Sequence, residues 1–234
     1  LAVSPRGRSV AARVTVLGPD GKGVDGLRVR VGGADADACR AGCYRATIPL
    51  ERSIDVALEG KGAKPATLRF ELPARWPAPD ATALLTKVDH AFRALTTVII
   101  HEHLASSSRN AIDTVYHLEA PNRMTYDIAG GSDAIVIGKT RWDRDSSTAP
   151  WQRSKQEPLR QPEPFWGSDP RRNARLLGPG RLSFYDPKLP AWFELTVDPR
   201  TGRLLALRMT AEAHFMRHRY SGFDKPFRIV PPRP

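Results

Sequence analysis

Long apolar runs, cysteine, methionine and catalytic signatures are scarce or missing in this sequence. The longest β-branched stretch, residues 96–100, has the length of a strand, whereas a membrane-spanning helix needs about 20 apolar residues. The signatures GxSxG, HExxH and GxxxxGKS/T do not occur. We therefore expect a chain that does not itself cross a membrane and that is not an enzyme, with no catalytic residues.

Acidic residues are outnumbered: the 234 residues include 25 acidic and 36 basic ones, for a net charge of +11. A basic chain raises the question of nucleic-acid binding, but the arginines are spread singly, with one adjacent pair, Arg171-Arg172. No basic helix, zinc-finger spacing or RNP-type aromatic motif accompanies them. We expect no nucleic-acid partner, and a weak preference of the surface for anionic partners such as lipid head groups.

The two cysteines, Cys39 and Cys43, form one close pair. Three residues separate them, which does not fit the CxxC redox pattern, and no histidine lies nearby to complete a zinc site. We expect a disulfide, with two reduced thiols as the alternative. A disulfide implies an oxidising, extracytoplasmic compartment, either periplasmic or at the cell surface. Because the chain begins at Leu1 rather than Met, we also expect a processed protein or a piece of a longer one.

Two folding units are expected, because hydrophobic residues make up 41% of the chain and a proline-rich linker interrupts it at 73–79. Residues 1–74 read as short strands joined by Gly/Pro turns, which predicts a small β-sandwich. Its segments 14–24 and 27–31 resemble the immunoglobulin-like modules called carboxypeptidase-regulatory-like. The second unit is expected at 79–234.

The second unit is predicted to start with a helix from Asp80, as its N-cap, to about Ala94, with an apolar stripe that includes Leu84, Leu85, Val88 and Phe92. A long antiparallel meander should follow, then an irregular Pro- and Trp-rich inset at 158–179. The sheet should resume with three strands, the last of them a single strand over 204–220. A tight hairpin turn is expected at 198–202.

Several short motifs of the second unit resemble the LolA/LppX class of lipoprotein carriers: residues 98–105, 116–126, 134–142 with Trp151, and 193–207. The resemblance implies a half-open antiparallel β-barrel with a helix lid over an apolar concave face, and hence a mainly-β (all-β or α+β) chain. With the preceding sandwich and residues 214–220, the chain is also similar to the extracytoplasmic tail of actinobacterial copper-resistance (CopC/CopD-type) membrane proteins. That similarity implies a membrane domain in the same polypeptide.

The histidines follow strand periodicity, in which alternate residues share a face. His101 and His103 should point the same way, with His117 diagonally across, and His214, Met216 and His218 should lie opposite the core face of a strand 204–220. Imidazole with thioether suits copper, Cu(I) in particular. Ordinary polar-face histidines and another metal are the alternatives. The candidate metal ligands are His101, His103, His117, His214, Met216 and His218.

Large aromatic side chains form a second candidate set. In a barrel with a lid they could line a cavity that takes an acyl chain, or they could simply seal the barrel. The candidate cavity residues are Phe92, Trp151, Phe165, Trp166 and Trp192.

Three functions remain open from the sequence. The first is a non-catalytic extracytoplasmic protein that holds an apolar or lipidic ligand in the half-barrel. The second is a copper-handling soluble tail of a copper-resistance or transport membrane protein. The third is an interaction domain with a filled barrel. No cofactor is required, although copper is possible, and the partners would be a lipid or apolar ligand and either a membrane surface or a membrane domain of the same polypeptide, to which the protein is tethered.

Overall fold

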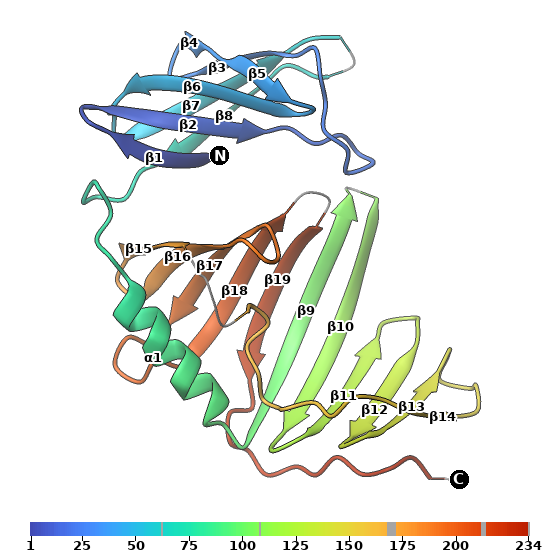
Figure 1. Cartoon of the computed structure of the whole chain (residues 1–234). Helices are drawn as coiled ribbons and strands as arrows, with labels where there is room; N and C mark the ends of the chain where they lie inside the picture. The colour runs from blue at the N-terminus through green and yellow to red at the C-terminus, as the bar shows by residue number, and fades with distance from the viewer. Residues whose placement is uncertain (62, 108, 168–171, 212–213, 234) are drawn as a thin grey trace. The chain divides into compact units, whose positions relative to one another are not determined.

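The computed structural model describes residues 1–61, 63–107, 109–167, 172–211 and 214–233. The chain divides into two compact units: Leu1–Pro79 with Ser106–Arg109, and Asp80–Ala105 with Asn110–Pro234 (Figure 1). Both are built mainly of antiparallel strands, and the described part of the chain contains one α-helix, so the predicted mainly-β class is confirmed. Within those ranges, no helix has the length and apolarity that crossing a membrane requires.

The first unit consists of two four-stranded antiparallel sheets around one core. Alternate residues of one sheet, such as Val10 and Val14, are buried against Val29 and Val31 of the other. The first sheet has the order β1 (Ala2–Arg6), β2 (Ser9–Thr15), β6 (Cys43–Pro49), β5 (Asp37–Arg40). The second has the order β4 (Ala34–Asp35), β3 (Arg28–Val31), β7 (Ser53–Glu59), β8 (Ala66–Glu71).

The expected disulfide joins Cys39 of β5 to Cys43 of β6, with their Cα atoms 5.2 Å apart. Between them Gly42 has a φ of 67°, which an L side chain rarely adopts and which lets the chain turn back at once. A loop this short removes little entropy from the unfolded chain, so the bond mainly fixes the shape of the turn.

The second unit is one open eleven-stranded sheet, called the large sheet below, and a helix. Among the described residues, the two end strands, β14 and β15, do not pair with each other. Figure 1 shows α1 (Thr82–Arg93) lying across one part of the sheet. The strand order is β14 (Gln152–Lys155), β13 (Thr140–Arg144), β12 (Asp133–Ile137), β11 (Arg123–Ile128), β10 (Asn110–Glu119), β9 (Thr97–Ser107), β19 (His214–Ser221), β18 (Leu204–Ala211), β17 (Ala191–Val197), β16 (Arg181–Asp186), β15 (Arg172–Gly178).

Helix α1 starts slightly later than predicted, and Asp80 is not its N-cap. Ala81 occupies that position, and the Asp80 carboxylate instead accepts a hydrogen bond from the backbone N–H of Thr82 at 2.9 Å. These hydrogen bonds from Thr82 lower the pKa of Asp80 below its ordinary value. The predicted apolar stripe faces the sheet, with Leu85, Val88 and Phe92 buried.

Two strand predictions need correction. The region 204–220 is not one strand but the hairpin β18–β19, in which Ala211 lies opposite His214 and Met209 opposite Met216. The inset predicted as irregular at 158–179 contains a strand, β15, which pairs with β16 through Leu176 and Leu182. Residues 168–171 of that inset lie outside the described residues.

The hairpin turn predicted at 198–202 joins β17 to β18 and is closed by a hydrogen bond from the Gly202 N–H to the Asp198 carbonyl at 2.7 Å.

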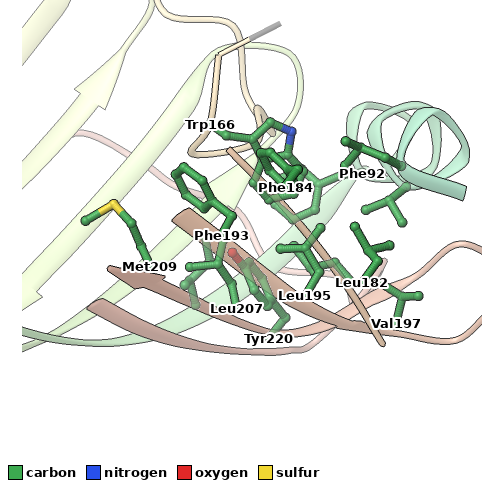
Figure 2. Packing of buried hydrophobic residues seen from close by; sticks show 14 of the residues in the cluster. Phe92, Trp166, Leu182, Phe184, Phe193, Leu195, Val197, Leu207, Met209 and Tyr220 are labelled. Carbon is green, nitrogen blue, oxygen red and sulfur yellow. The ribbon is translucent and has the colours of Figure 1, made fainter. Parts of the chain in front are cut away.

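The core of the second unit lies between α1 and the large sheet, and Figure 2 shows its aromatic side chains gathered there. The rings of Phe184 and Phe193 stack at 5.0 Å, and Trp166 meets both edge-on. Phe92 of the helix meets Tyr220 edge-on at 5.6 Å. The face of the large sheet that carries this core is called the inner face below, and the opposite face the outer face.

Candidate functional site

The inner face is covered in two different ways. Over β15–β19, here the helix-covered half, burial alternates sharply: in β17 Phe193 and Leu195 are buried, whereas Trp192 and Thr196 are exposed. Over β9–β14, the strap-covered half, the alternation is kept in β9 but fades in β11 and β13. In β11 all residues but Asp127 are only half-buried, and in β13 all are. These two strands are therefore loosely covered on both faces, whereas Ala134 and Val136 of β12 between them are buried.

The cover over its inner face is residues 156–167, called the strap below, which crosses the sheet toward α1 (Figure 1). At one end its backbone N–H groups bond to strand turns, from Gln156 to the Lys139 carbonyl and from Gln161 to the Pro121 carbonyl. At the other end side chains tie it to α1. Glu163 pairs with Arg93 at 2.6 Å, and the Trp166 indole N–H donates to Asp89 at 2.9 Å. The strap is therefore attached at several points along its length, and its Pro162 and Pro164 are buried.

An apolar strip continues from the core beneath the strap. Leu104, Tyr116 and Met124 are partly exposed and pack against the buried cluster. The strand register places Met124 beside Leu118 on one side and Val136 on the other, so these side chains share the inner face. The packed core thus leads into a half-covered apolar surface.

A buried polar cluster lies where the two halves meet. His218 of β19 stands directly opposite Glu102 of β9, and their side chains are 3% and 5% exposed. The His218 Nε2 and Glu102 Oε2 atoms are 2.7 Å apart, and His218 Nδ1 lies 2.9 Å from the Tyr220 hydroxyl. Tyr116 donates to the other Glu102 oxygen at 3.1 Å. Each polar atom therefore has a partner, as burial in an apolar setting requires.

The electrostatics of this cluster keep its phenols protonated. Burial raises the pKa of Tyr220 well above its ordinary value, and the nearby Glu102 carboxylate raises it further. Burial and the same carboxylate also raise the pKa of Tyr116. Both hydroxyls can therefore donate hydrogen bonds at any physiological pH.

Polar contacts continue from the cluster into the strap-covered half. The Tyr116 ring lies 5.7 Å from that of Tyr126, whose hydroxyl accepts a hydrogen bond from Arg141 at 2.7 Å. Arg141 also pairs with Asp143 at 2.6 Å. These groups are half-buried, so the inner face offers hydrogen-bonding groups beside its apolar strip.

Two small cavities flank α1, each of about 170 Å³. One lies at the end of the helix near Phe92 and Leu204, and the other at its beginning near Leu85 and Arg175. Pockets for drug-sized ligands usually measure about 300–1,000 Å³. Both cavities are smaller than that range, and neither is lined by residues of the strap.

The structure separates the predicted metal ligands, because the β18–β19 hairpin shifts the face assignment by one residue. Met216 and His218 lie on the inner face, opposite Leu104 and Glu102, and not on the polar face that was predicted. His101 lies on the outer face, as the alternation predicted. The six candidate residues therefore do not share one surface.

The outer-face histidines have other contacts. His103 Nδ1 lies 2.8 Å from Asp113, and His117 meets the ring of Phe227 edge-on at 5.5 Å. Burial, and to a smaller extent nearby His101, lower the pKa of His117. His214, by contrast, shares the alternation of Met216 and His218 and is exposed at the start of β19. Among the described residues, no group of three or more His, Cys, Asp or Glu side chains could hold a metal ion, and copper binding stays a prediction.

The five predicted cavity aromatics also separate. Phe92 and Trp166 are part of the packed core. Phe165 is 49% exposed on the strap, and its ring meets that of His218 edge-on, with the ring centroids 5.7 Å apart. Trp192 is on the outer face, since it lies opposite Thr210 and next to buried Phe193. The Arg144 guanidinium stacks over the ring of Trp151. Only Phe165 lies at the border of the strap-covered half.

The sequence did not identify Glu102, Tyr116 and Tyr220 as candidate site residues. Glu102 did carry a signal, because it falls between Ile100 and Leu104 on the apolar face of its strand. A carboxylate at a core position is rarely buried unless it is paired. Its partner could not be named, since the pairing of β9 with β19 joins segments more than 100 residues apart.

Comparisons with known proteins identify no family. No protein-family model matches the chain, and no curated protein matches it. Among solved structures, the crystal structure of a LolA superfamily protein from Nitrosomonas europaea matches with 12% identity and a TM-score of 0.29, over 66% of this chain and 96% of that chain. It belongs to the superfamily that the sequence motifs resemble, but at this score the likeness carries no argument. The immunoglobulin-like and copper-resistance resemblances gain no support.

Proposed function

We propose that the second unit is a non-catalytic binding domain that holds an apolar or lipidic ligand on the inner face of the strap-covered half. The observation that carries this proposal is the half-covered strip of Leu104, Tyr116 and Met124, which extends the core beneath the strap. Covering such a strip is favourable by roughly 25 cal/mol for each Å² of apolar surface removed from water.

The ligand is expected to be amphipathic. Its apolar part would lie along the strip, while Tyr126 and Arg141 provide hydrogen-bonding groups at the edge of the same surface. The strap would act as the movable cover, because it belongs to no strand or helix and is held by a few hydrogen bonds and a partly exposed ion pair. The packed aromatic core under α1 would stay closed.

The expected setting is extracytoplasmic and membrane-associated. The Cys39–Cys43 disulfide supports an oxidising compartment. A lipidic ligand would also place the domain near a membrane, from which such ligands come.

The test is titration of the chain with a fluorescent fatty acid, with emission followed as the probe leaves water. Leu104 faces inward and Ala105 outward, opposite Phe215 of β19, so the two neighbours give a matched pair of variants. Leu104→Glu should weaken binding about 10-fold or more, since a carboxylate would enter the apolar strip, and Ala105→Glu should leave affinity unchanged.

A second variant shows whether weaker binding by Leu104→Glu is caused by misfolding. Leu104→Trp should also weaken binding, by filling the strip without adding charge. Equal probe affinity in the wild type and in correctly folded Leu104→Glu and Leu104→Trp would contradict the proposal, as would no binding by the wild type.

A further inference from the structure

The outer face of the large sheet carries a row of charged side chains across neighbouring strands. The register places Arg208 of β18 directly opposite Glu194 of β17 and directly opposite Arg217 of β19. Arg217 in turn lies opposite His103 of β9. Two arginines thus stand side by side near the middle of an exposed surface.

This row has more positive charge than its carboxylates balance. Glu194 already pairs with Arg181. In the described part of the chain no ion pair is found for Arg208, Arg217 or Arg219, and Arg219 lies opposite His101. Like charges directly opposite each other on neighbouring strands destabilise a sheet. A bound anion would relieve this repulsion.

A second row, of aromatic residues, runs beside the first. Trp192 lies opposite Tyr185 and Thr210, and Thr210 lies opposite Phe215. Trp192 is 36% exposed and Phe215 37% exposed, although both are large and apolar. Each residue of this second row lies two positions along its strand from a residue of the charged row, as Trp192 does from Glu194. The outer face therefore presents arginines and aromatic rings together.

We propose that this outer face docks on the surface of an anionic lipid bilayer. Basic side chains are attracted to the head groups of an anionic membrane, and Trp and Tyr favour the boundary between head groups and acyl chains. Five neighbouring strands form the surface, from β16 to β9, which at about 4.8 Å per strand spacing gives a broad face suited to a bilayer. Docking here leaves the inner face free, so it does not depend on the proposed ligand.

The experiment is co-sedimentation of the whole chain with phosphatidylcholine vesicles, with and without phosphatidylglycerol. The wild type should sediment with the anionic vesicles only, and less as salt is added. Arg208→Gln/Arg217→Gln should weaken this binding about 10-fold or more. Neutralising both side chains removes their mutual repulsion, so the variant should remain folded, which circular dichroism would confirm.

A matched control is available in the first unit, where Arg13 of β2 lies directly opposite Arg45 of β6. Arg13→Gln/Arg45→Gln changes the net charge equally and should leave vesicle binding intact. An equal loss in both double variants would mean general charge attraction and would overturn the proposal, as would no loss in either. Binding to soluble polyglutamate as strong as binding to the anionic vesicles would point to an acidic protein partner and also overturn it.

Discussion

The two halves of the large sheet share one inner face but differ in how that face is packed. Under α1, Trp166, Phe184 and Phe193 meet ring against ring, and each is 2% exposed or less. Under the strap, Tyr116 and Met124 stay partly exposed, and polar groups lie between the apolar ones. The helix-covered half has a closely packed core, whereas the strap-covered half has a partly exposed apolar surface.

This difference shows where a ligand can be accommodated. A packed core gains nothing from a ligand, because its atoms already contact one another at close to crystal density. A half-covered strip does gain, because part of its apolar area still faces water. The buried pair of Glu102 and His218 marks the border between the two.

The largest expected effect tests the helix-covered half. Phe92→Ala should reduce the free energy of unfolding by about 3–5 kcal/mol, since it leaves a cavity in a packed core. The half-exposed Phe165 is the matched control, and Phe165→Ala should cost less than about 1 kcal/mol. Denaturant titration measures both. A loss below about 1 kcal/mol for Phe92→Ala would show that the helix is peripheral.

The next largest expected effect tests the buried pair of Glu102 and His218 at the border between the two halves. Glu102→Leu or His218→Leu alone should cost about 3 kcal/mol, because each leaves a buried polar partner behind. The double variant should cost clearly less than the sum of the two, since both partners are then apolar. Denaturant titration of the four proteins gives this coupling, and additive losses would mean that the pair does not interact.

A smaller effect tests the attachment of the strap. Arg93→Gln removes the ion pair with Glu163, which is partly exposed, so the stability loss should be at most about 1 kcal/mol. Local opening should change more, with faster amide exchange in residues 156–167 and no change in β17 and β18. Arg181→Gln, which breaks an outer-face pair with Glu194, is the control and should leave exchange of the strap unchanged. Equal exchange rates in the wild type and Arg93→Gln would show that this pair does not hold the strap.

The smallest effect is a pH dependence of the strap-covered half. The folded state lowers the pKa of His117, so the unfolded state takes up a proton more readily. This contribution to the free energy of unfolding is therefore complete above the ordinary histidine pKa of about 6.5. It declines as the pH falls from there toward the lowered pKa. Between pH 7.5 and 5.5 the free energy of unfolding should decrease slightly, because solvent screens this partly exposed imidazole. It should appear as faster amide exchange at 222–233, where Phe227 contacts His117. His117→Phe should abolish this change, and an unaltered response in that variant would assign it to another group.

Local patterns predicted much of this fold. The turn at 198–202 contains Asp-Pro and Gly, the helix stripe has a clear period, and the close cysteine pair gives the disulfide. The β18–β19 hairpin was missed because the sequence between Ala211 and His214 is Glu-Ala, which lacks the Gly, Asn or Pro of common turns. Missing that hairpin reversed the faces of Met216 and His218.

The candidate site was less predictable than the fold. It depends on the pairing of β9 with β19 and on the path of the strap, both of which join segments far apart in the chain. Periodicity shows which side chains share a face within one strand, but it does not show which strands are neighbours. Glu102 could be singled out as a charged residue on an apolar face, whereas its contact with His218 required the structure.

The most direct test of the binding proposal is photo-crosslinking with a diazirine-labelled fatty acid, followed by mass spectrometry of the labelled peptides. Labels are expected on the strap and on β9–β12, with few on β16–β18, and unlabelled fatty acid should compete with the labelling. Labels concentrated on residues 182–211, or labelling that unlabelled fatty acid does not reduce, would contradict it.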